Sequence, residues 1–96
     1  MRVFETLDEF KAAKGEPLGP SDWVTITQEQ INGFADATGD HQWIHTDPER
    51  AKAGPFGTAI AHGYLTLSLL PAFIDSLYEI KSLKMGLNYG ANKLRF

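Results

Sequence analysis

The chain has 96 residues, of which 43% are hydrophobic and 22% are charged, and its formal net charge is −3. A chain of this length supports one hydrophobic core, so we expect a single domain over residues 1–96. The weakly acidic charge offers no basic field for nucleic acid or an anionic membrane, which leaves small molecules and proteins as partners. Cysteine is absent, so disulfides, a thiolate zinc site and a cysteine nucleophile are excluded.

The apolar segments of the chain predict its subcellular location. The N-terminus lacks the basic-then-apolar pattern of a signal peptide, and the longest apolar region, residues 64–78, is interrupted by Thr, Ser, Pro and Asp. We therefore expect a cytoplasmic protein that does not enter a membrane.

Two capping boxes predict helices in the first forty residues. Residues 6–9 and 27–30 each begin with Thr and end with Glu or Gln, the pattern that opens a helix. The first helix is expected to stop at Gly15 and the second at Gly39, since glycine is a common residue just past a helix end. Between them, the β-branched and aromatic residues of segment 23–26 predict a short strand.

The second half is predicted to be dominated by one apolar helix. Segment 40–46 has no periodicity and is expected to be a loop, while residues 47–53 open with Asp-Pro, a cap and a first helical residue. Residues 64–78 are apolar nearly all round, which predicts a buried helix, and Pro71 is expected to bend it or end its first half. Alternating apolar residues then predict a strand over 83–96.

A helix buried on most sides needs several strands around it. Only the two short candidates, 23–26 and 83–96, are available to cover it. We therefore expect the chain to be the N-terminal part of a larger domain, and we expect self-association, as a homodimer, to cover the remaining apolar surface.

Asp40 and His45 are the strongest candidates for chemistry. They lie five positions apart between two helices, so a loop could direct both side chains at one point. A carboxylate and an imidazole that share a water can remove one proton and return another, which is general acid–base catalysis. The alternative is that Asp40 caps a helix end and His45 is an ordinary loop residue.

A metal site is the second use for this segment. Imidazoles and carboxylates four or five positions apart commonly bind metals, and this segment offers His41, His45, Asp40 and Asp47. The segment is not a continuous helix that would place His41 and His45 on one face. We therefore expect neither a metal nor another cofactor.

Residues 34–45, Phe-Ala-Asp-Ala-Thr-Gly-Asp-His-Gln-Trp-Ile-His, followed by Ala51, resemble the signature of the MaoC-like, (R)-specific enoyl-CoA hydratases. Residues 54–63 resemble the next block of that family, and 88–90 with 93–96 resemble the strand after its central helix. One departure is Gln42-Trp43, where the family usually has Asn-Pro.

The resemblance implies an α+β hot-dog fold, in which an antiparallel sheet wraps around a long central helix at about residues 63–78. It also implies a hydro-lyase that adds water to trans-2-enoyl-CoA, giving (R)-3-hydroxyacyl-CoA, or that runs the reverse dehydration in fatty acid metabolism. Asp40 would be the base that activates water, and His45 would hold that water and supply a proton to C2.

Four further residues are candidates for binding the oxyanion or the substrate. The helix opening near His62 and Gly63 offers unpaired amides to an enolate oxygen, although Gly63 could equally serve helix packing and a structural hydrogen bond is favoured for His62. Gln42 can orient a neighbour through its amide, and Trp43 would form an apolar wall that limits substrate shape.

Two other functions stay open for the same scaffold. The chain could be a non-catalytic module that dimerises or binds acyl-CoA, or a hot-dog thioesterase that presents its carboxylate to the thioester carbonyl. The hydratase is favoured because His45 accompanies Asp40 at the spacing of the family.

Overall fold

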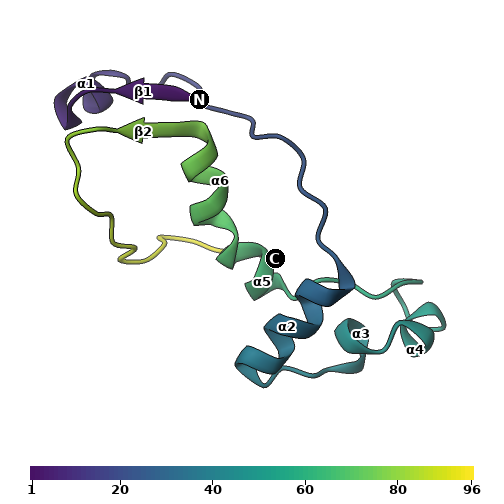
Figure 1. Ribbon diagram of the computed structural model, residues 1–96. Helices are drawn as coiled ribbons and strands as arrows, with labels where there is room; N and C mark the ends of the chain where they lie inside the picture. Colours follow the sequence, from purple (N-terminus) through teal and green to yellow (C-terminus); the bar gives the residue numbers. More distant parts are fainter. The chain divides into compact units, whose positions relative to one another are not determined.

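The computed structural model describes all 96 residues and contains six helices and two strands (Figure 1). This mixture confirms the α+β class. The chain forms two compact units. We call residues 1–22 with 71–96 the terminal unit, and residues 23–70 the central unit.

The terminal unit is built on a two-stranded sheet. Strand β1 (Arg2–Phe4) pairs with strand β2 (Tyr78–Ile80), with Phe4 opposite Ile80. The strands run parallel. The antiparallel pairing that the family resemblance implies is therefore wrong for this pair. The connection from β1 to β2 contains all six helices, and a long crossover of this kind allows two paired strands to run in the same direction.

Aromatic rings form the core of the terminal unit. Phe4 is buried, and the rings of Phe4 and Phe10 meet edge to face with centroids 5.3 Å apart. The Phe10 ring also stacks on that of Tyr78, with centroids 4.8 Å apart. Phe10 belongs to helix α1 (Leu7–Ala12), which the Thr6 side chain caps as predicted by accepting a hydrogen bond from the Glu9 amide. The helix ends at Ala12, before the predicted stop at Gly15. These contacts hold α1 against the two strands.

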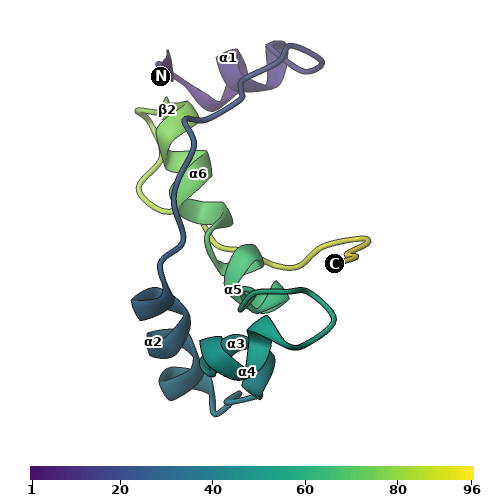
Figure 2. The same ribbon diagram turned by 90° about the vertical axis from the view of Figure 1, so that its right-hand side faces the viewer.

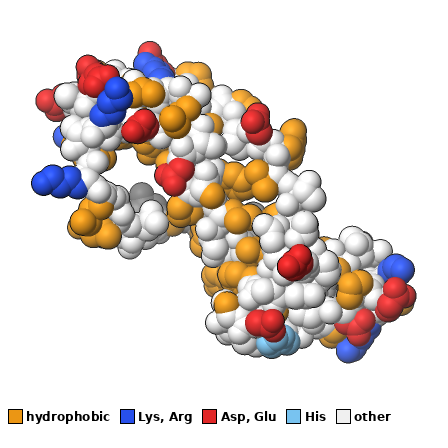
Figure 3. All heavy atoms as spheres, viewed as in Figure 1, with side chains coloured by type: hydrophobic (Ala, Val, Ile, Leu, Met, Phe, Trp, Pro, Cys, Tyr) orange, Lys and Arg blue, Asp and Glu red, His pale blue; other side chains and the backbone are white.

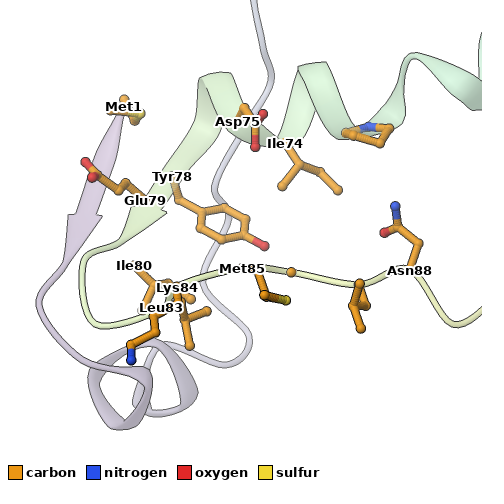
Figure 4. A pocket seen from close by; sticks show the side chains of 13 residues that line it. Met1, Ile74, Asp75, Tyr78, Glu79, Ile80, Leu83, Lys84, Met85 and Asn88 are labelled. Carbon is orange, nitrogen blue, oxygen red and sulfur yellow. The ribbon is translucent and has the colours of Figure 1, made fainter.

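A pocket of about 740 Å³ lies in the same unit, between helix α6 (Leu70–Leu77), β2 and the segment that follows (Figure 4). Figure 4 shows Ile74 and Asp75 on the helix side and Met85 and Asn88 on the segment after β2. The predicted strand 83–96 is absent. Residues 81–96 are all exposed and form no strand, because no neighbouring strand offers hydrogen-bond partners.

The central unit contains four helices, which both ribbon views show grouped together (Figures 1 and 2). They are α2 (Gln28–Thr38), α3 (Trp43–Thr46), α4 (Pro48–Lys52) and α5 (Gly63–Ser68). The predicted capping box of α2 is complete, and Gly39 ends this helix at φ 85° as predicted. Asp47 caps α4 as predicted. The helix α3 was not predicted, because its four residues are too few to show a periodicity.

The predicted central helix, 63–78, is two helices. α5 ends at Ser68, and α6 begins at Leu70. The prediction for Pro71 is confirmed, since proline has no amide hydrogen to donate to the preceding turn. Burial on most sides is wrong, because Leu65 is the single buried residue of α5 and α6 has none.

Hydrophobic side chains are exposed in both units, as the orange patches of Figure 3 show. Trp23 is fully exposed, and the strand predicted for 23–26 does not form, since no other strand lies beside it. None of the helices has the length and apolar character that crossing a bilayer requires.

Candidate active site

The chain turns sharply after α2 and brings Asp40 to the start of α3. Gly39 has the left-handed backbone that this turn requires, and its amide donates to the Ala35 carbonyl at 2.8 Å. The Asp40 carboxylate then accepts a hydrogen bond from the Gln42 amide at 3.3 Å. This local bond across two residues holds the carboxylate beside α3.

His45 lies in the single turn of α3, where its side chain is buried at 7% exposure. Its Nδ1 lies 2.7 Å from the carbonyl oxygen of Ile60. A carbonyl oxygen can only accept, so Nδ1 carries the hydrogen and donates it. Nε2 therefore faces the site as an acceptor when the ring is neutral and as a second donor when the ring is protonated.

The loop before α5 is joined to α3 by two hydrogen bonds, one from the backbone amide of Ile60 and one to its carbonyl. The Ile60 amide donates to the Ile44 carbonyl at 3.0 Å, while the Ile60 carbonyl accepts from the His45 ring. These two bonds fix the orientation of the imidazole, which in turn determines where Nε2 points.

His62 connects the two predicted catalytic residues. Its Nε2 donates to the backbone carbonyl of Asp40 at 2.9 Å, and its ring stacks on that of His45 with centroids 4.0 Å apart. The ring of Phe34 covers it at 4.9 Å. His62 is 2% exposed, and its Nδ1 is buried without a hydrogen-bond partner.

Asp40, His45 and His62 therefore form one cluster, in which one polar atom from each residue lies within 4.8 Å of the others. The two imidazoles are buried and Asp40 is exposed, so the cluster is open to solvent at the carboxylate. Hydrogen bonds to water span about 2.7–3.2 Å, so one water fits between atoms at these separations.

The stacking of the two imidazoles does not suit a single metal ion bound by both rings. A metal lies in the plane of the imidazole that binds it, and the planes of His45 and His62 are stacked at an angle of 25°. Their lone pairs therefore lie in two nearly parallel planes, with ring centroids 4.0 Å apart, and do not converge on one ion. The other two candidates lie elsewhere: His41 is exposed and 3.8 Å from Asp36, and Asp47 caps α4.

The remaining candidate residues, Gln42, Trp43 and Gly63, make different contacts. Gln42 acts through its backbone, since its carbonyl accepts from the His45 amide at 3.0 Å and its side chain is exposed. The Trp43 ring packs under the Arg50 guanidinium at 4.4 Å and against Gly54. Gly63 is the first residue of α5, directly after His62.

Gln28 contributes a contact that the sequence did not indicate. Its Nε2 donates to the His45 carbonyl at 2.7 Å and to Asn32 Oδ1 at 2.9 Å. The sequence gives no sign of this contact, because a glutamine in the first turn of a helix is common and the bonded carbonyl of His45 lies 17 residues away in the chain. No local pattern could have identified this contact.

The family of this chain follows from comparison with known proteins. The family model described as "MaoC like domain" matches residues 9–96. The chain belongs to the MaoC-like domain family.

Several curated proteins resemble this MaoC-like domain. The 3-hydroxyacyl-thioester dehydratase Z of Mycobacterium tuberculosis is 64% identical over 96 residues, which are 100% of this chain and 64% of that protein. Nodulation protein N of Rhizobium meliloti is 50% identical, over 95% of this chain and 58% of its own length. The 3-hydroxybutyryl-CoA dehydratase of Methylorubrum extorquens is 43% identical, over 53% of this chain and 32% of its own length. The domain thus spans less than two thirds of the length of these relatives.

A solved structure identifies the fold of the MaoC-like domain. The monoamine oxidase regulatory protein from Archaeoglobus fulgius matches with a TM-score of 0.56 and 31% identity, over 84% of this chain and 54% of that one. This neighbour is a MaoC-like hot-dog protein. The helices and small sheet described here are part of a hot-dog fold, as the resemblance implied.

Proposed function

We propose that this MaoC-like domain adds water to the double bond of a trans-2-enoyl-CoA thioester to give (R)-3-hydroxyacyl-CoA, or removes water in the reverse direction. The observation that carries the proposal is the cluster in which Asp40 and His45 offer polar atoms within 4.8 Å of one another. The names of two relatives, a 3-hydroxyacyl-thioester dehydratase and a 3-hydroxybutyryl-CoA dehydratase, support the same reaction.

Hydration requires one proton to leave water and one to reach carbon. Asp40 takes a proton from the bound water as the water oxygen forms its bond to C3. The electrons of the C2–C3 double bond move to C2 and the thioester oxygen as an enolate. His45, protonated on both nitrogens, then gives its Nε2 proton to C2 while Nδ1 continues to donate to Ile60. One proton passing from Asp40 to His45 restores both groups.

Gly63, Gln42 and Trp43 assist the proposed reaction in different ways. Gly63, the first residue of α5, offers its amide to the enolate oxygen. The Gln42 amide holds the Asp40 carboxylate at 3.3 Å. Trp43 packs on Arg50 and Gly54, so it limits the substrate from the side of α4.

The test is the loss of enoyl-thioester absorbance when the protein is added to crotonyl-CoA. Asp40→Asn and His45→Gln should each lower kcat/KM by about 10²- to 10⁴-fold, because each removes one acid–base group. His41→Gln is the matched control, since His41 is exposed and lies outside the cluster. Unchanged turnover in Asp40→Asn would rule out the proposal, and chiral analysis of the product tests the (R) configuration.

The same assay separates the hydratase from a thioesterase. A thioesterase would release free thiol from acyl-CoA and leave the double bond intact, whereas the hydratase consumes the double bond and releases no thiol.

We also propose that the protein is cytoplasmic and forms a homodimer. The exposed hydrophobic side chains of both units support self-association, which sedimentation measures directly.

A further inference from the structure

His62 is the least exposed member of the cluster, and it contacts both proposed catalytic residues by different means. Its Nε2 hydrogen reaches the backbone carbonyl of Asp40, so it holds the main chain that carries the carboxylate. Its ring face lies on the His45 ring, so it also limits how that imidazole can tilt. Phe34, from α2, holds His62 from another side.

This arrangement costs stability. With Nε2 donating, Nδ1 of the neutral ring is an acceptor, and it is buried without a partner. A buried unsatisfied polar atom costs about 1–3 kcal/mol. Phenylalanine would fill much of the same space without this cost, so packing alone does not account for a histidine. The property that only the histidine adds is its hydrogen bond to Asp40.

We propose that His62 is a positioning residue: it sets the separation of the Asp40 carboxylate and the His45 imidazole through one hydrogen bond and one stacked contact. The inference rests on the proposed hydration reaction. Displacing reacting groups by about 1 Å can cost roughly 10²-fold in rate, so a residue that holds both groups controls turnover without touching the substrate.

Three substitutions separate the two contacts. His62→Gln keeps a donor at nearly the position of Nε2 and loses the ring. His62→Phe keeps the ring and loses the donor. His62→Met, which matches glutamine in length, loses both.

The experiment measures kcat and KM on crotonyl-CoA for the full chain and each variant, together with thermal unfolding. We expect kcat to fall by about 10- to 100-fold in His62→Met at unchanged KM, and His62→Gln and His62→Phe to retain more of it. Equal kcat in the Gln and Met variants would overturn the role of the hydrogen bond. If all three variants fail to fold, His62 is a structural residue and the proposal is likewise overturned.

A second measurement does not depend on turnover. The Gln42 amide donates to the Asp40 carboxylate, so its proton NMR resonance reports the position of that group. We expect this resonance to move in His62→Met and to stay near its original position in His62→Gln, with the Gly39 amide at the end of α2 as an unaffected reference. If the wild-type protein does not hydrate crotonyl-CoA, the proposed function fails, and this resonance still decides whether His62 positions Asp40.

Discussion

The side chain of Gln28 donates a hydrogen bond of 2.7 Å to the backbone carbonyl of His45, which joins the first turn of α2 to α3. The same Nε2 also donates to Asn32, one turn further along α2. The bond to His45 is partly buried, so the His45 carbonyl depends on this donor. α3 has a single turn, and a contact from outside it is needed to hold its histidine in place.

Replacing Gln28 tests this contact. Gln28→Met keeps the length of the side chain and removes the donor, so we expect a loss of about 1–2 kcal/mol in the free energy of unfolding. Gln28→Glu should cost more, because its carboxylate would face two oxygen acceptors. Urea unfolding measures both, and equal stability of all three proteins would show that the bond contributes nothing.

Gly54 is expected to tolerate no side chain. A Cβ there would lie 2.9 Å from two atoms of the Trp43 ring, which is held under Arg50. Gly54→Ala should therefore lower the free energy of unfolding by about 1–3 kcal/mol through overpacking.

Gly33 is the matched control for Gly54. It lies within α2, where an added Cβ would have no atom within 4 Å apart from its chain neighbours and the backbone of the same helix. Gly33→Ala should raise the free energy of unfolding by about 0.5–1 kcal/mol, because alanine loses less backbone freedom in a helix. If thermal unfolding shifts both variants in the same direction, the packing described for Trp43 is wrong.

The capping box of α2 should carry measurable stability. Thr27 accepts from the Gln30 amide at 3.2 Å, and the Gln30 side chain accepts from the Thr27 amide at 2.9 Å. Thr27→Ala should cost about 1 kcal/mol, as measured by urea unfolding, whereas Thr27→Ser keeps the acceptor and should cost much less. Similar losses in both variants would contradict a role for the hydroxyl.

Turnover should not depend on a bound metal. The rings of His45 and His62 are stacked in nearly parallel planes, so their in-plane lone pairs do not converge on one ion. We expect hydration of crotonyl-CoA to be unchanged after prolonged treatment with EDTA. Loss of activity that Zn²⁺ or Mn²⁺ restores would contradict this expectation.

The sequence by itself determined the local features of this protein. Caps and helix ends at Thr6, Thr27, Gly39, Asp47 and Pro71 were all predictable, because each depends on residues within four positions of one another. The resemblance of residues 34–51 to the MaoC-like signature identified the family for the same reason, since a signature is a local pattern. The match over residues 9–96 confirms it.

Only the tertiary structure decided which residues lie together. The contacts of His45 with Ile60 and of His62 with Asp40 join residues 15 and 22 positions apart, and one partner in each is a backbone carbonyl that every residue possesses. The sequence therefore does not reveal which backbone carbonyl accepts such a hydrogen bond. The strands predicted for 23–26 and 83–96 failed for the same physical reason, because a strand forms only where another strand supplies its hydrogen bonds.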